Sequence, residues 1–171
     1  MEFFETLQAR QSIRAFSQES LEPELVGKIL EAINSAPSAG NLQAFEVYLV
    51  TSNELRRKLA KTASDQAFLA QAPAVLVFCA HPARSQGRYG ERGAELYSLQ
   101  DATIACTYAM LAATALGLSS VWVGAFEEKE VGRVLGLPGE YRPVALLPVG
   151  KGAESPPRPS RRNPDEIIHR I

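Results

Sequence analysis

Residues 74–80 read AVLVFCA, a run without a polar side chain and rich in residues that favour extended chains. A strand that is apolar throughout, instead of alternating, is typical of the centre of a sheet with both faces covered. Cys79 lies in this run and Cys106 in another apolar run, so both are interpreted as buried thiols and not as a disulfide or a nucleophile. The sequence therefore predicts a central, fully buried strand.

The segments on either side of this run alternate between helical and extended patterns. One helix begins at Pro23, where Glu22 and Glu24 suit the positive end of the helix dipole, and it must end near Pro37. The alternation of helices and strands predicts a mixed α/β or α+β fold. Helices are also predicted over residues 2–9, 53–63, 99–116 and 127–135, strands over 45–51, 119–123 and 142–149, and an extended segment over 10–16.

The overall composition is that of an ordinary globular protein. The chain has 171 residues, 46% hydrophobic and 22% charged, which predicts one domain over residues 1–171. Its 18 basic and 19 acidic residues leave a net charge of -1, which argues against a nucleic-acid partner. No apolar run is long enough to span a membrane, and the first residues lack a signal-peptide pattern. A cytoplasmic protein without a membrane partner is therefore expected.

Two segments differ from the rest of the chain. Residues 82–98 are polar, contain three glycines and two tyrosines, and are predicted to form a long mobile loop that acts as a lid. Residues 151–171 contain four prolines and little apolar content before Ile167 and Ile168. Such a tail is either disordered or extended on another surface. We expect the second, with the tail docked on a second copy of the chain.

The segment at residues 10–14 places Arg10, Ser12 and Arg14 at alternate positions. On an extended chain these three side chains project to one face. Two guanidinium groups beside a hydroxyl suit a phosphate group, because arginine binds phosphate with two parallel hydrogen bonds. A charged, solvent-exposed strand edge is the alternative interpretation.

A second candidate segment is PSAGNLQ at residues 37–43. Asn41 and Gln43 each donate and accept hydrogen bonds, which suits the edge of a heterocycle with mixed donors and acceptors. Gly40 permits close approach of a ligand to the backbone. The alternative is a turn that simply ends a helix.

Two weaker candidates follow along the chain. Residues 122–126, WVGAF, end a strand and begin a helix, where backbone N–H groups form a fixed set of donors, although both aromatics also suit a core. Arg161 and Arg162 lie in the proline-rich tail, where arginine is ordinarily a solubilising residue. Only two histidines, His81 and His169, are present, and no Cys/His cluster has metal-ligand spacing, so no metal site is expected.

In their order and spacing, these segments resemble the FMN-dependent nitroreductase family. The resemblance covers nearly the whole chain, and the blocks around Ser38–Gln43 and Gly124 are its most specific parts. It is carried by RQSIR at residues 10–14, APSAGNLQ at 36–43, ATALGLSSVWVGAF at 113–126, LGLP at 135–138, PVALLPVG at 143–150, RNP at 162–164 and IIH at 167–169.

The resemblance implies an α+β fold with a mainly antiparallel sheet flanked by helices. It implies an intertwined homodimer whose C-terminal tails wrap the partner, with two FMN molecules at the interface. The family pattern assigns the FMN phosphate and pyrimidine side to Arg10, Gln11, Ser12 and Arg14, with Arg162 reaching the phosphate. It assigns the ring to Pro37, Ser38, Ala39, Asn41 and Gln43 of the other subunit, and to Val123, Gly124 and Ala125.

The chain departs from the family pattern at three places. Many relatives read Pro-Trp where this chain has Ala44 and Phe45. Some larger members place Asn and Lys at the pyrimidine edge ahead of the second strand, where this chain offers Gln66 as a candidate substitute. The chain also lacks the long insertion of the larger members, so the expected lid work falls to residues 82–98.

The activity implied by the resemblance is that of an FMN oxidoreductase. Hydride would pass from NADH or NADPH through flavin N5 to a nitroaromatic, a quinone or a similar small acceptor, in a ping-pong order. No catalytic side chain is expected, because the flavin carries the chemistry. Three alternatives stay open at this point: a relative that acts on its own flavin, like the synthase of dimethylbenzimidazole; a dehalogenase-like member; and a non-catalytic FMN-binding protein.

Overall fold

In the computed structural model, which describes all 171 residues, the apolar run forms the central strand β2 (Ala74–Ala80). Its neighbours are β1 (Phe45–Val50) and β4 (Arg142–Gly150), and the short β3 (Ser119–Ser120) completes the order β1-β2-β4-β3. All three pairings are antiparallel. Every residue of β2 is buried, so the predicted central strand with two covered faces is confirmed.

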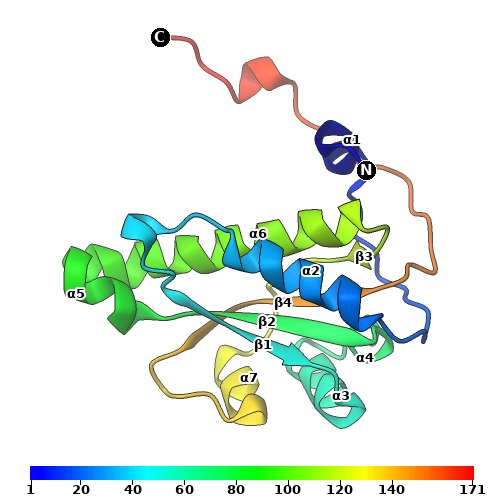
Figure 1. Ribbon diagram of the computed structural model, residues 1–171, viewed down its shortest axis with the longest axis horizontal. Coiled ribbons are helices and arrows are strands. Elements are labelled where there is room, and N and C mark those ends of the chain that lie inside the picture. Colours follow the sequence, from blue (N-terminus) through cyan, green and yellow to red (C-terminus); the bar gives the residue numbers. More distant parts are fainter.

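The side chains of β2 alternate between two hydrophobic cores, one on each face of the sheet. Val75, Val77 and Cys79 pack with helices α3, α4 and α7, whereas Leu76 and Phe78 pack with α2 and α6. Figure 1 shows these two layers on opposite faces of the sheet. The helices are α2 (Pro23–Asn34), α3 (Asn53–Thr62), α4 (Phe68–Gln71), α6 (Ser98–Ala115) and α7 (Glu128–Leu135).

Helix α6 has 18 residues, a length of about 27 Å at 1.5 Å per residue. It runs along one face of the sheet beside α2 (Figure 1). Ala105, Ala109 and Ala113 are fully buried there, and their small side chains let the helix lie close to β2 and β4. The predicted helix over residues 99–116 is therefore confirmed.

The N-terminal part of the chain packs near the C-terminal end of α6. Helix α1 (Phe3–Ala9) contacts α6, and the chain then extends along the edge strand β3. The backbone N–H of Ile13 donates to the carbonyl of Ser120 at 3.2 Å. The strand predicted over residues 119–123 is shorter than expected, because beyond Ser120 only Val123 pairs, with Leu146 of β4.

The predicted mobile loop at residues 82–98 is wrong, because the segment is helical. It forms α5 (Pro82–Arg92) and a π-helical turn, η2 (Gly93–Tyr97), which leads directly into α6. Gly90 adopts a φ of +60°, which breaks the helix and lets η2 fold against α5. A Cβ at Gly93 would lie 2.6 Å from the carbonyl oxygen of Ser85, so this close approach needs glycine. Two of the three glycines that suggested a loop therefore form a turn and a packing contact, and Gly87 lies within α5.

The C-terminal residues 151–171 leave the body of the protein in an extended form. Ala153 donates to the carbonyl of Ala15 at 2.8 Å, and beyond this bond the tail contains only the short helix η3 (Pro164–Glu166). Figure 1 shows the tail passing α1 and ending away from the sheet. Ile167, Ile168 and Ile171 are exposed. The extended conformation agrees with the sequence prediction.

None of the helices combines the length and the apolar character that crossing a membrane would require.

The helical packing of residues 82–97 can be tested with a matched pair of glycine substitutions. Gly93→Ala should destabilise the protein by about 1–3 kcal/mol, because the new methyl overlaps the Ser85 carbonyl. Gly87→Ala, in the preceding helix α5 and with no atom within 4 Å of the added Cβ, should be neutral or stabilise by about 0.5–1 kcal/mol. Urea unfolding measures both values, and equal small effects would contradict the packing described.

Candidate functional site

Four arginines from two distant parts of the chain line one cavity of about 620 Å³. Arg10 and Arg14 come from the extended N-terminal segment, and Arg158 and Arg161 come from the tail. Ser12 contributes a hydroxyl, and none of the lining residues is acidic. A cavity with this donor set suits an anion with several oxygen atoms, such as a phosphate group.

Local pairing explains why the N-terminal segment presents these side chains. Ile13 is only 7% exposed and its backbone bonds to Ser120, so the residues on either side of it face away from the core. With its amide oriented to match its neighbours, Gln11 accepts from Nε of Arg158 at 2.9 Å and donates to the carbonyl of Pro156 at 3.2 Å. These bonds tie the tail to the strand and keep the arginines together.

Arg162 lies outside the cavity that holds Arg10 and Arg14. Its guanidinium donates to the carbonyl of Glu166 at 2.9 Å and lies 3.3 Å from the carboxylate of the same residue. It does not line the cavity, whereas Arg158 and Arg161 do. Sequence reasoning missed Arg158, although a third arginine in the same proline-rich segment was a visible signal. The role assigned to Arg162 stays a prediction.

The loop from Ser38 to Ala44 has an unusual backbone. Gly40, Asn41 and Gln43 have φ values of +56°, +57° and +44°. Left-handed conformations of non-glycine residues cost on the order of 1–2 kcal/mol each, so this shape needs support from its surroundings. Within the loop, Ser38 Oγ accepts from the backbone N–H of Gln43 at 2.9 Å, and the Gln43 amide contacts Asn41.

Asp101, in the first turn of α6, supplies support from outside the loop. Its Oδ1 accepts from the backbone N–H of Ala39 at 2.9 Å, and its Oδ2 accepts from that of Ala44 at 3.2 Å. The residue is only 2% exposed. Sequence reasoning missed it, although a lone charge in the alanine-rich α6 was a signal.

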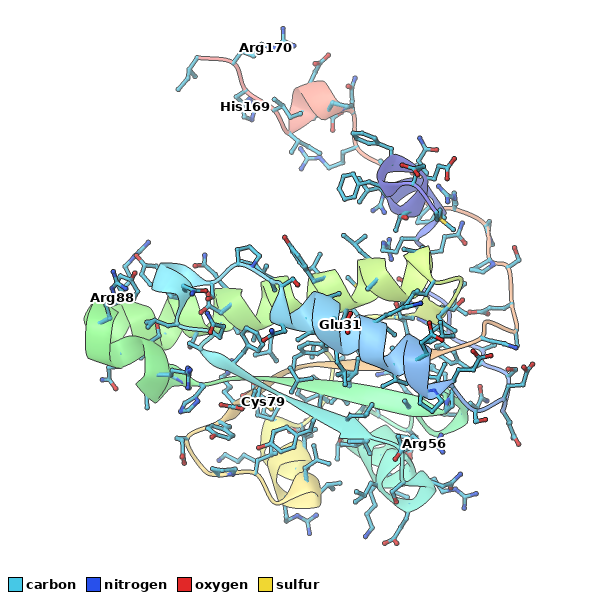
Figure 2. The ribbon with its side chains drawn as sticks, viewed as in Figure 1. Glu31, Arg56, Cys79, Arg88, His169 and Arg170 are labelled. Atoms are coloured by element: carbon cyan, nitrogen blue, oxygen red, sulfur yellow. The ribbon has the colours of Figure 1, made fainter.

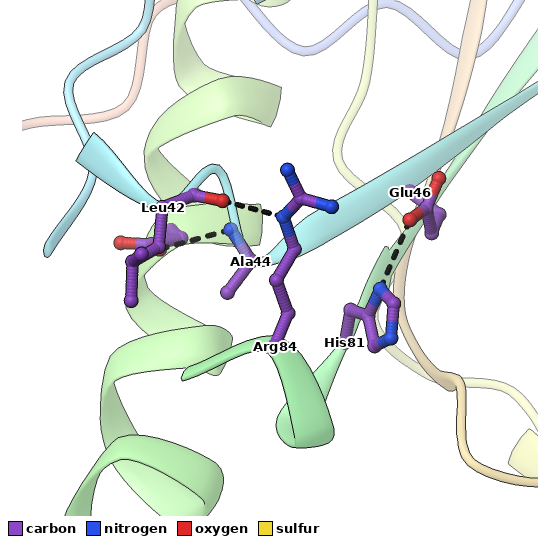
Figure 3. A network of polar contacts seen from close by, with 6 residues as sticks. Leu42, Ala44, Glu46, His81 and Arg84 are labelled. Carbon is purple, nitrogen blue, oxygen red and sulfur yellow. Dashed lines mark hydrogen bonds and ion pairs between the residues drawn. The ribbon is translucent and has the colours of Figure 1, made fainter. Parts of the chain in front are cut away.

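Helix α5 supports the same loop through its basic residues. Arg84 Nε donates to the carbonyl of Leu42 at 2.6 Å, and Arg88 Nη1 lies 3.3 Å from the carbonyl oxygen of Gly40. Figure 3 shows the Arg84 and Ala44 contacts on the loop. A Cβ at Gly40 would lie 2.4 Å from the Tyr89 hydroxyl, at the end of a side chain that can move aside, so it is the φ of +56° that favours glycine there.

A small polar cluster lies next to this loop, at the end of β2. His81 Nδ1 is 3.0 Å from Glu46 Oε1, as Figure 3 shows, and the His81 and Tyr141 ring centroids are 4.6 Å apart. Burial, with a smaller effect of Glu46, raises the pKa of the nearby Cys79 thiol to about 12. Burial also raises the pKa of Tyr141. At neutral pH this thiol and this phenol are protonated, so neither is an activated nucleophile.

The expected third group, Val123 to Ala125, leaves the sheet beside β4. Val123 is 4% exposed and exchanges two backbone hydrogen bonds of 3.0 Å with Leu146. Gly124 and Ala125 follow it and are exposed. The Gln66 amide lies 3.4 Å from the carbonyl oxygen of Ala125, so the candidate substitute named from the sequence does lie beside this group.

A second cavity, of about 610 Å³, borders the loop on the α6 side. Pro37, Ser38 and Ala39 form one wall, and Tyr97 and Ile104 are among the residues of the other. The expected ring-binding residues 37–39 therefore do border a recess.

One chain does not bring the arginine cavity and this loop together. The loop is bonded to Asp101 at the N-terminal end of α6, whereas residues 10–14 pair with Ser120, just beyond its C-terminal end. Most of the length of α6 therefore lies between them. Figure 1 shows the two groups at opposite ends of this helix.

Comparison with known proteins shows which family has this architecture. A sequence profile described as the Nitroreductase family matches residues 7–68 and 60–151. The chain belongs to the Nitroreductase family. The resemblance expected from the sequence and the antiparallel α+β fold with flanking helices are thereby confirmed.

Individual members show how far the similarity extends. The chain is 31% identical over 181 aligned residues to the FMN reductase [NAD(P)H] of Bacillus subtilis, covering 98% of this chain and 73% of that protein. The structure of NfrA2 from B. megaterium has a TM-score of 0.92 at 31% identity, over 99% of this chain and 74% of that one. The NADPH:FMN oxidoreductase of Vibrio harveyi, complexed with NAD+, has a TM-score of 0.90 at 27% identity, over 98% and 76%.

Proposed function

We propose that this member of the Nitroreductase family is an NAD(P)H-dependent FMN oxidoreductase. The observation that carries the proposal is the cavity lined by four arginines and no acid, which suits the phosphate of FMN. The names of its relatives, FMN reductase [NAD(P)H] and NADPH:FMN oxidoreductase, support the same cofactor and electron donor.

The residues present fit FMN in two respects. Arg10, Arg14 and Ser12 supply donors for the phosphate, and the side-chain amides of Asn41 and Gln43 supply donors and acceptors for the ring edge. The exposed backbone of Gly124 and Ala125 would complete the ring site. When bound, FMN supplies hydride chemistry between NADH or NADPH and a nitroaromatic, quinone or similar acceptor, in a ping-pong order.

The task of the polypeptide is to bind and orient. Arginine guanidinium groups anchor the charged end of the cofactor, and the loop at residues 38–44 presents its amides in one rigid conformation. No side chain is assigned as a general acid or base. The helical segment at residues 82–97, first considered as a lid, holds the loop through Arg84 and Arg88.

The separation of the two groups along α6 favours a site shared between two chains. A second copy would bring its loop at residues 38–44 to the arginine cavity of the first, which a single chain does not do. The exposed Phe3, Phe4 and Leu7 on α1, with Ile167 and Ile168 in the tail, are apolar residues that such a homodimer would bury. The tail would then lie across the partner.

The spectrum of the purified protein tests the function directly. We expect flavin absorption bands that bleach when NADH or NADPH is added without oxygen and that return when a quinone or a nitroaromatic is added. Bound flavin that is not reduced by either nucleotide would favour a non-catalytic flavoprotein. Loss of the flavin to a smaller aromatic product in air would favour a flavin-fragmenting relative, and a protein that binds no FMN would contradict the proposal.

Arginine substitutions test the phosphate site. Arg10→Ala or Arg14→Ala should each weaken FMN binding about ten- to a hundredfold, because a charge-assisted bond worth about 1.5–3 kcal/mol is lost. Arg10→Lys should restore only part of the affinity, since the planar fork is absent. Comparing Arg158→Ala with Arg162→Ala by flavin-fluorescence titration shows which tail arginine reaches the phosphate. Unchanged affinity in both the Arg10 and Arg14 alanine variants would remove this assignment.

Truncation tests the shared site. Deleting residues 152–171 should dissociate the dimer and release FMN in the same experiment, because the tail is expected to join both functions. Deleting only residues 164–171 leaves the lining of the arginine cavity intact, so it should weaken the dimer with a smaller loss of FMN. Light scattering with absorbance detection measures mass and flavin together. A flavin-loaded monomer, in either truncation or in the full chain, would contradict the shared site.

A further inference from the structure

We propose that Asp101, together with Arg84, is a positioning group that holds the loop Ser38–Ala44 in the shape required to bind the flavin. Neither side chain is assigned a contact with the cofactor. The inference rests on the proposed function, because it needs this loop to contact FMN.

The loop depends on contacts from outside itself. Asn41 and Gln43 lie in the left-handed region of φ, which asparagine tolerates but glutamine rarely adopts. Within the loop, Ser38 Oγ and the Gln43 amide form hydrogen bonds, and two backbone bonds of a 3-10 turn join Asn41 to Ser38 and Leu42 to Ala39. A short segment with this backbone would relax to other conformations if its external contacts were removed.

The external contacts have complementary charge. The N–H groups of Ala39 and Ala44 both point to the carboxylate of Asp101 on α6. The carbonyls of Gly40 and Leu42 accept from Arg88 and Arg84 on α5, and Figure 2 shows Arg88 toward the end of that helix. An anion therefore holds the N–H groups of the loop and two cations hold its carbonyls, which defines one orientation of the backbone.

The environment of Asp101 indicates that this is its main role. The residue is 2% exposed, and no lysine, arginine or histidine forms an ion pair with it. Burying a carboxylate without a cation is unfavourable unless both of its oxygen atoms are hydrogen-bonded. Both of its hydrogen bonds go to the loop, and Ala44 is fully buried, so removing the carboxylate would leave the Ala44 N–H without an acceptor.

The test combines an isosteric variant with a surface variant of the full chain. In Asp101→Asn one oxygen atom is replaced by an NH2 group, which then faces a backbone N–H instead of accepting from it. Arg84→Ala removes an exposed side chain whose loss does not open the core, and Arg84→Lys keeps one donor. Glu31→Gln is the matched control, because this exposed carboxylate on α2, labelled in Figure 2, forms no side-chain hydrogen bond.

Three measurements are made on each variant. The first is the hydrogen exchange of the Ala39 and Ala44 amides in the FMN-free protein. The second is the dissociation constant of FMN, and the third is the visible circular dichroism of the flavin at saturation, which reports the geometry around the ring. Melting temperature is recorded alongside, so that a general loss of stability is recognised.

We expect Asp101→Asn to exchange the two amides faster, to bind FMN about ten- to a hundredfold more weakly and to change the visible circular dichroism. Arg84→Ala should weaken binding about two- to tenfold and Arg84→Lys less, whereas Glu31→Gln should match the wild type. Wild-type exchange, affinity and circular dichroism in Asp101→Asn would overturn the inference. If that variant does not fold, wild-type values in Arg84→Ala would overturn it.

These results separate the inference from the proposed function. One outcome is that the wild-type protein binds no FMN while the Ala39 and Ala44 amides still exchange faster in Asp101→Asn. The proposed function then fails, and the support of the loop by Asp101 stands. If the wild-type protein binds FMN and neither variant alters its binding or its circular dichroism, the function stands and the positioning role fails.

Discussion

The burial of β2 on both faces is the constraint from which the rest of the structure follows. A strand whose seven residues are all buried must be covered twice, so the chain has to supply helices for each side. Because successive side chains alternate, the same strand contributes to both cores. Helices α3, α4 and α7 meet one set of its side chains, and α2 and α6 meet the other.

The longest of these covering helices also determines where binding groups lie. Helix α6 carries the loop Ser38–Ala44 at its first turn through Asp101, and its other end leads to β3, against which residues 10–14 extend. The packing that closes the core therefore places the two candidate binding groups at opposite ends of this helix. A ligand that needs both groups is then best accommodated between two chains, so the architecture of the core and the proposed assembly are linked.

Much of the fold was predictable because it depends on local patterns. The apolar run at residues 74–80, the small residues of α6 and the proline that begins α2 each express a preference that tertiary packing reinforces. The segment at residues 82–98 was not predictable in this way. Its glycines suggested flexibility, and only the packed structure shows that Gly90 makes a turn and Gly93 a close contact with Ser85.

The candidate site also contains residues that local patterns predict and residues that only long-range contacts place. Arg10, Ser12 and Arg14 were recognisable because alternate positions of an extended segment face one way. The sequence shows Arg158 as a third arginine of the proline-rich tail but does not place it in the cavity, because that place depends on the contact of the tail with Gln11, across more than 140 residues of chain. Long-range contacts of this kind leave no periodic signal near the residue itself.

Asp101 illustrates why polar residues inside a core carry more information than exposed ones. A carboxylate within an alanine-rich helix contributes nothing to apolar burial, and an alanine would pack there at lower cost. The presence of this buried carboxylate is explained by the two backbone N–H groups that donate to it. Both belong to a loop whose backbone conformation is otherwise unfavourable. Arg84 and Arg88 complete the arrangement from α5. The loop is therefore held by the electrostatics of two helices that flank it, and its rigidity is a property of the whole fold and not of its own seven residues.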